Sequence, residues 1–111
     1  MVPDQTEFRA DGRKSRLVVW AGRSGRRYTL SEAGPEALAD GRLYVLAEQE
    51  CVRWAGTARD LISDQASRAL FRKWTGGGAT LLSLAAPDDE TALMTLIWDL
   101  EGSRRLGRSA A

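Results

Sequence analysis

Apolar and polar residues alternate along two stretches of the chain, and a polar or glycine-containing segment interrupts each stretch. Residues 16–21 (RLVVWA) and 26–30 (RRYTL) flank Gly-Arg-Ser-Gly, while residues 43–47 (LYVLA) and 51–55 (CVRWA) flank Glu-Gln-Glu. Short alternating runs rich in β-branched and aromatic residues, joined by such segments, are typical of β-hairpins. The pattern therefore predicts one hairpin over residues 16–30 and a second over residues 42–56.

Two further stretches have the three-to-four-residue spacing of amphipathic helices. In the first, apolar residues recur from Ala58 to Trp74, Thr57 can cap the start, and Asp60 can reach back to the cap. In the second, apolar residues recur over 93–100, after three acidic residues that suit the positive end of a helix dipole. We expect one helix over residues 58–74 and another within residues 87–102.

The remaining segments complete a fold of the α+β class. Residues 79–86 (ATLLSLAA) form a nearly continuous apolar run, which predicts a buried strand, and residues 31–41 predict a turn and a short helix. The element order is then ββ(α)ββαβα, a small, mostly antiparallel or mixed sheet of about five strands with two main helices on one face. We expect a single domain over residues 16–102, a flexible basic arm over residues 1–15 and a flexible basic tail over residues 103–111.

The composition narrows the environments and chemistries open to the chain. Its 111 residues are 43% apolar and 28% charged, as in a single globular domain. The apolar runs are far shorter than the roughly 20 residues of a membrane span, and the first residues lack the apolar core of a secretion signal. We therefore expect a cytoplasmic protein with no membrane partner. With no histidine and one cysteine, a Ser-His-Asp triad and a thiolate zinc site are excluded, and we expect no metal site and no cofactor.

Charge is unevenly distributed along the chain, although the net charge is only +1. Residues 1–27 carry seven basic and three acidic side chains, residues 28–101 carry six basic and twelve acidic ones, and the final segment adds three arginines. Basic ends on an acidic body either keep the chain solvated or contact an anionic partner. The candidate binding residues lie on the first hairpin and its approach, with one tryptophan added: Arg13, Lys14, Arg16, Arg23, Arg26, Arg27 and Trp54.

Four tryptophans are many for a chain of this length: Trp20, Trp54, Trp74 and Trp98. Each side chain is large and mostly apolar, so we expect all four to pack in the core. A platform on which nucleic-acid bases stack would instead require at least one of them exposed on a basic face.

From residue 42 onward the chain resembles the GIY-YIG family. Tyr44 matches the tyrosine of the family's first motif, Gly56 matches the glycine of the second, and Leu61 stands at the leucine of the following helix. Residues 88–93 (DDETAL) resemble the lead-in to the family's last helix. The resemblance covers residues 42–101 and implies the order strand, strand, helix, strand, helix. It also implies metal-dependent nuclease activity, which in that family uses a tyrosine, a helix arginine and a metal-binding glutamate.

The departures from the family pattern fall on the catalytic positions. Arg42 replaces the first glycine, Trp54 replaces the second tyrosine, and Asp64 stands where the helix arginine belongs. The glutamate position falls near Thr95 or Leu96. Tryptophan has no hydroxyl that could activate water, and an aspartate cannot stabilise charge that builds on a phosphate as a guanidinium does.

Two hypotheses about function follow. The first is a non-catalytic binding or adaptor module whose partner is another protein or an anionic polymer, including nucleic acid, contacted by the arginine-rich first hairpin. The alternative is an enzyme, a diverged GIY-YIG-like nuclease with Tyr44 as general base and Arg59 or Arg68 in place of the missing arginine.

Overall fold

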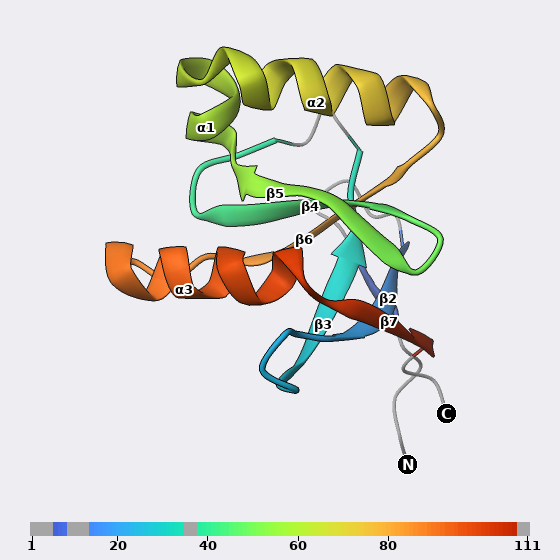
Figure 1. Cartoon of the computed structure of the whole chain (residues 1–111). Helices are drawn as coiled ribbons and strands as arrows, with labels where there is room; N and C mark the ends of the chain where they lie inside the picture. Colours follow the sequence, from blue (N-terminus) through green and yellow to red (C-terminus); the bar gives the residue numbers. More distant parts are fainter. Residues whose placement is uncertain (1–5, 9–13, 35–37, 109–111) are drawn as a thin grey trace.

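The computed structural model describes residues 6–8, 14–34 and 38–108, which form seven strands and three helices (Figure 1). In chain order these are β1 (Thr6–Phe8), β2 (Lys14–Ala21), β3 (Arg27–Glu32), β4 (Arg42–Glu48), β5 (Cys51–Thr57), α1 (Ala58–Ser63), α2 (Gln65–Gly76), β6 (Thr80–Ala85), α3 (Glu90–Glu101) and β7 (Arg104–Arg108). The fold is α+β, as predicted. Both predicted hairpins, the single strand after the first long helical stretch and the final helix are confirmed.

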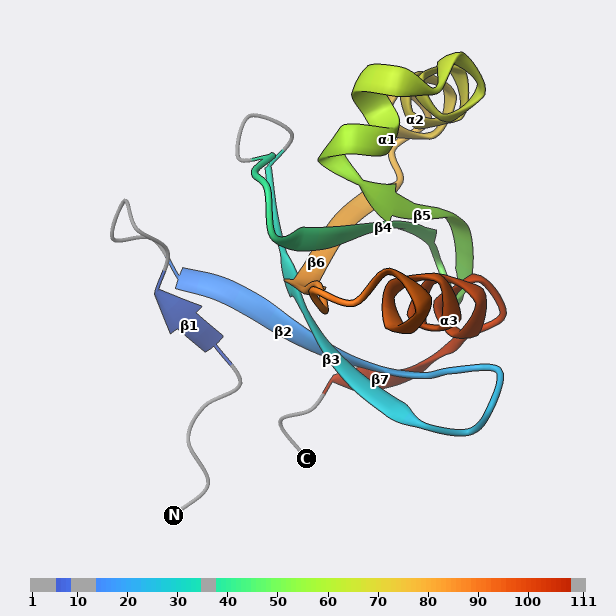
Figure 2. The ribbon, with the colours of Figure 1, turned by 90° about the vertical axis from the view of Figure 1, so that its left-hand side faces the viewer.

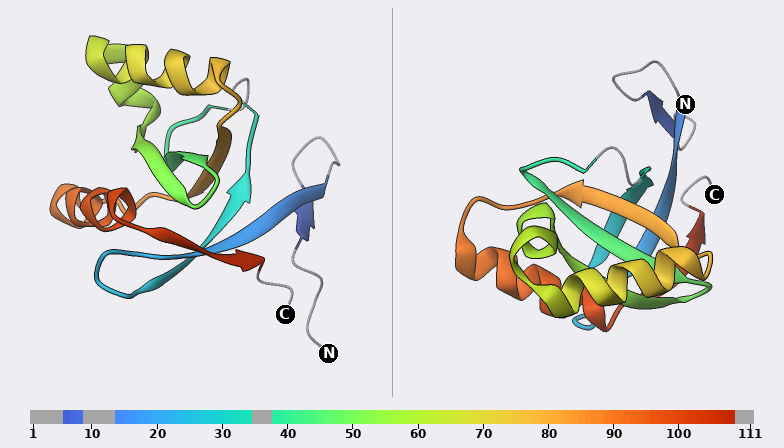
Figure 3. Two further views of the ribbon diagram at one scale, coloured as in Figure 1. Left: turned by 45° about the vertical axis from the view of Figure 1, so that its right-hand side comes forward. Right: turned by 90° about the horizontal axis from the view of Figure 1, so that it is seen from above.

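All of the strand pairings are antiparallel, and they curl the sheet on itself (Figure 3). The strand order is β1-β2-β3-β6-β4-β5-β7, and β7 also pairs with β2, so β2 to β7 form a closed ring. Two seams of this ring are short, because β3 meets β6 over two residue pairs and β5 meets β7 at one. Closure satisfies backbone groups that an open sheet would leave at its edges.

Strand β4 separates two hydrophobic clusters, because successive side chains of a strand point to opposite faces. Leu43 and Val45 belong to the first cluster, which α3 covers, whereas Tyr44 and Leu46 belong to the second, which α1 and α2 cover. Figure 2 shows α3 between the two hairpins, with α1 and α2 on the other side of the β4–β5 hairpin. The expectation that the helices share one face is therefore wrong, and burial on both faces explains why β4 is apolar at successive positions.

The helix expected over residues 58–74 is two helices, broken at Asp64. The backbone of Asp64 is extended, and its side chain accepts a hydrogen bond from the amide of Ala66, so it caps the start of α2. Arg68 donates to the carbonyls of Leu61 and Ile62 at 3.2 and 2.7 Å, which satisfies acceptors that the end of α1 would otherwise leave free. A capping residue inside an apolar periodicity thus ends one helix and begins another.

The chain ends differ from the sequence-based expectation. Strand β7 lies within the stretch predicted as a flexible tail, and β1 lies within the stretch predicted as a flexible arm. The polar sequences of β1 and β7 give little strand signal. Both strands are held through backbone pairing with β2, which does not depend on side-chain type. The described residues next to the short helix expected within 31–41 are not helical, and residues 35–37 lie outside the described part of the chain.

Among residues 6–8, 14–34 and 38–108, no helix combines the length and the apolar character needed to cross a membrane.

Candidate functional site

A surface hollow of about 850 Å³ lies where the β2–β3 turn, β5 and β7 meet the end of α3. We call it the arginine groove, because four arginines line it against two glutamates: Arg23, Arg53, Arg104 and Arg105, with Glu50 and Glu101. Cys51 and Leu106 also line the groove, and both are exposed. The groove is therefore an open surface with a net positive lining.

The pairing of β2 with β7 brings the basic ends of the sequence together. Arg104 lies opposite Ala21 in this pairing, at the point where β2 leads into the turn that carries Arg23. Arg104 also lies opposite Cys51 of β5. Charge that is divided between two ends of the sequence is thus concentrated on one surface.

Asp99 of α3 fixes the turn that carries Arg23. Its carboxylate accepts hydrogen bonds from the Ser24 amide at 2.6 Å, the Ser24 hydroxyl at 2.8 Å and the Tyr28 hydroxyl at 2.5 Å. Its backbone carbonyl accepts from the Arg23 amide at 2.9 Å. Gly22 leaves room for this carboxylate, since a Cβ there would lie 2.5 Å from the Asp99 Oδ2 atom. We call this arrangement the Asp99 clamp.

The clamp changes the protonation equilibria of two of its members. Burial disfavours the charged carboxylate, but the hydrogen bonds from Tyr28 and Ser24, aided by the charge of Arg26, outweigh it and lower the pKa of Asp99 below its usual value. Burial, followed by the hydrogen bond to Asp99 and its negative charge, raises the pKa of Tyr28. A carboxylate stabilised in its charged form is a poor proton acceptor for Ser24, so we interpret the cluster as structural.

Arg23 packs against an exposed tryptophan at the rim of the groove. Its guanidinium carbon lies 4.7 Å from the centre of the Trp98 ring, and its Nε donates to the Trp98 carbonyl at 3.3 Å. Gly102 leaves space for this side chain, because a Cβ there would lie 2.7 Å from the Arg23 Nε atom. Trp98 is 51% exposed.

The exposure of Trp98 corrects the expectation that all four tryptophans pack in the core. Trp20 and Trp54 are buried and Trp74 is half-buried, but Trp98 is not. A signal was present in the sequence, since apolar residues at 93, 96, 97 and 100 place position 98 on the opposite side of the helix. Sequence reasoning also missed Asp99, whose partners are distant in the chain.

The predicted binding residues are placed in different surroundings. Arg23 lines the arginine groove, while Arg26 and Arg27 are exposed, and Arg26 lines a separate hollow between β3, β6 and α3. Two further predicted residues, Lys14 and Arg16, lie on β2, and Arg13 is outside the described residues.

Trp54 is a packing residue rather than part of the exposed surface. It is 7% exposed, and its ring meets Phe71 of α2 edge-on, with 5.7 Å between the ring centres. It therefore does not contribute an exposed binding face. The outer face of β5 is covered by α1 and α2, which is why this tryptophan is buried.

The residues of the nuclease hypothesis also lie in different surroundings. Arg59 lines a cleft of about 330 Å³ with Arg42 and Asp88, at the start of α1. Tyr44 is buried in the second hydrophobic cluster, where its hydroxyl accepts from the Ala39 amide at 2.7 Å. Arg68 caps the end of α1. Neither Tyr44 nor Arg68 lines the cleft in the part of the chain that the structure describes.

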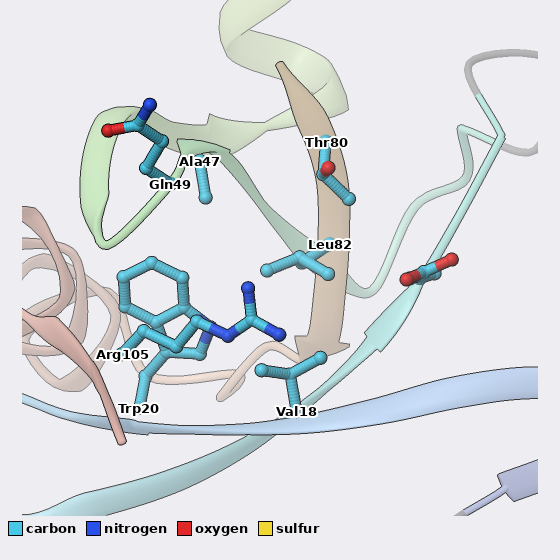
Figure 4. Close-up of a pocket in the computed structure, with 8 residues that line it drawn as sticks. Val18, Trp20, Ala47, Gln49, Thr80, Leu82 and Arg105 are labelled. Carbon is cyan, nitrogen blue, oxygen red and sulfur yellow. The ribbon is translucent and has the colours of Figure 1, made fainter. Parts of the chain in front are cut away.

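Arg105 also lines a small cavity of about 80 Å³ that is partly open to solvent (Figure 4). Trp20, its cross-strand partner, lines the same cavity, and the Trp20 indole nitrogen has no hydrogen-bond partner among the described residues. A cavity of this size has room for a few water molecules that can accept this hydrogen bond. Arg105 is half-buried, whereas the other three arginines of the groove, Arg23, Arg53 and Arg104, are exposed.

A comparison of this chain with protein-family models, curated proteins and solved structures found no match.

Proposed function

We propose that this protein is a non-catalytic binding module whose partner is an anionic polymer bound in the arginine groove. The observation that carries the proposal is the convergence of arginines from three distant segments, the β2–β3 turn, β5 and β7, around one surface hollow. Clustered cations raise the local concentration of an anionic ligand, and guanidinium groups suit phosphate, carboxylate or sulfate oxygens because their donors form a planar fork.

The four arginines contribute unequally to such a surface. Arg53 lies 3.1 Å from Glu48 and stacks on Trp74, so part of its charge is already balanced. Arg23 is held in place by the Asp99 clamp, and Arg104 is exposed at the start of β7. A cation that is positioned before binding loses less conformational entropy when the ligand arrives. Arg23, because it is held in position, and Arg104, because it is exposed, are therefore the principal contacts in this proposal.

The proposal is tested by titrating labelled polyanions, namely oligonucleotides, polyphosphate and heparin, at several salt concentrations. We expect affinity that falls as salt rises, and a slope of log K against log salt that decreases by about 0.7 when Arg23→Gln or Arg104→Gln removes one phosphate contact on a single strand. Arg72→Gln is the matched control, because Arg72 is an exposed arginine of α2 that does not line the groove.

Two results would overturn the proposal. The absence of salt-dependent affinity for any of these polymers would leave a protein partner as the ligand. Cleavage of an oligonucleotide with magnesium or manganese, abolished by Tyr44→Phe, would instead support the diverged nuclease. The order of β4, β5, α1, α2, β6 and α3 over residues 42–101 and the cleft beside Arg59 are the observations that favour this alternative.

A further inference from the structure

We infer that the polymer is a single-stranded nucleic acid and that one of its bases stacks on Trp98. This inference rests on the proposed function and adds the class of ligand to it. Phosphates alone do not require an aromatic side chain, whereas unpaired bases bind to exposed aromatic rings through stacking. The structure places one such ring beside the first cation of the groove.

The position of Trp98 suits this role better than that of the other tryptophans. Trp20 and Trp54 are at most 7% exposed, and Trp74 is half-buried, with the cationic groups of Arg53 and Lys73 over its ring. Trp98 is 51% exposed, and the Arg23 guanidinium that lies over its ring also lines the groove. A base can stack on the exposed part of the indole or on the outer face of the guanidinium, since both are flat and polarisable.

The geometry also links the base and phosphate contacts. Glu101 follows Trp98 by one helical turn and lines the groove, so Trp98 lies at the rim that leads to Arg104. Arg23 touches both regions, because it packs on Trp98 and Gly102 while lining the groove. A strand that crosses this rim can place a base on Trp98 while its adjoining phosphates meet the arginines. A duplex keeps its bases stacked within the helix and cannot make the first contact without unpairing.

The test compares two single strands of equal length, one of them abasic over its central residues, so that both carry the same phosphates. We expect the wild-type protein to bind the normal strand roughly tenfold more tightly than the abasic strand. Trp98→Ala should lose this preference and Trp98→Phe should keep most of it. The salt slope of Trp98→Ala should remain that of wild type, because an indole releases no counterions. Ile62→Ala, which removes another exposed apolar side chain outside the groove, is the matched control.

The outcomes separate this inference from the function on which it rests. Equal affinity for the normal and abasic strands, with a salt slope that the groove arginines control, would overturn the stacking inference and leave the anionic-polymer function in place. Binding of duplex or polyphosphate at least as tight as that of the single strand would have the same meaning. If the wild-type protein showed no salt-dependent binding to any of these polymers, both the stacking inference and the anionic-polymer function would be overturned. Thermal unfolding of each variant confirms that it is folded before its affinity is compared.

Discussion

The tripeptide Trp-Ala-Gly occurs twice in this chain, at residues 20–22 and 54–56, and the two copies are stabilised in different ways. Each lies at the end of a strand, β2 or β5, and its glycine has no room for a side chain. A Cβ at Gly22 would lie 2.5 Å from the Asp99 carboxylate, and a Cβ at Gly56 would lie 2.6 Å from the ring of Trp54. The first glycine thus makes room for a residue late in the chain, and the second for a residue two positions before it.

The segments that follow the two glycines differ in the same way, since one is held by a nearby carboxylate and the other by a carboxylate distant in the chain. After Gly56, the side chain of Thr57 accepts from the Asp60 amide, and the Asp60 carboxylate accepts from the Thr57 amide, which is a capping box. After Gly22, the turn obtains its carboxylate from Asp99, on α3. The same tripeptide therefore leads to a locally closed helix start in one place and to a turn closed by a distant element in the other.

The largest expected effect is the loss of folding stability when either of the two carboxylates that hold these segments, Asp99 or Asp60, is removed. Asp99→Ala should lower the free energy of unfolding by about 3 kcal/mol, because three hydrogen bonds to a charged, buried group are lost. Asp60→Ala should lower it by about 1 kcal/mol, the usual value for a helix cap. Urea unfolding followed by tryptophan fluorescence measures both. If Asp60→Ala lowered the free energy of unfolding as much as Asp99→Ala or more, the distant clamp would be no stronger than the local cap.

A smaller effect is expected from filling the glycine positions. Gly22→Ala should cost about 2 kcal/mol in the wild-type protein through overpacking against Asp99, and much less in an Asp99→Ala background, where the obstructing carboxylate is absent. Gly56→Ala should cost the same in both backgrounds, because its obstruction is Trp54. A double-mutant cycle measures the coupling. Additive effects for Gly22 and Asp99 would contradict the close contact between them.

The smallest expected effect is the loss of folding stability at acidic pH that arises from Asp99 in the first segment. The pKa of Asp99 is lower in the folded protein than its ordinary value of 3.8, so the unfolded state binds the proton first as pH falls. The stability from this charge is fully present above that ordinary value and is lost as pH falls through the folded pKa. Asp99→Asn should lack this component. Urea unfolding of the two proteins at a series of acidic pH values measures it, and parallel pH profiles would count against it.

The same contrast between local and distant contacts separates the features that could be predicted from those that could not. The capping box at Thr57 was predicted because its partners are three residues apart. The hairpins were predicted because alternation and turn residues are likewise local signals. The break at Asp64 was missed, although an aspartate inside an apolar periodicity was visible, because the same spacing continues on both sides of it.

The candidate site was predicted only in part. Arg23 was identified from the clustered charge of the first hairpin, but its neighbours across the groove were not, because Arg104 reaches it through a strand pairing that the polar sequence of β7 does not indicate. Trp54 was assigned to the binding surface, yet α1 and α2 bury it. Residue type alone does not show which element will cover a given face.

By itself, the sequence determined the α+β class, the two hairpins and the capped start of α1, because each depends on spacings of a few residues. Only the tertiary structure decided the closure of β7 onto β2, the clamp between Asp99 and the first turn, and the contact between Trp98 and Arg23. These features depend on which elements of the fold contact one another. An amphipathic pattern shows that one face of an element is buried, but it does not show which other element covers that face. The arginine groove belongs to this second group, since its cations come from three segments that only the closed sheet brings together.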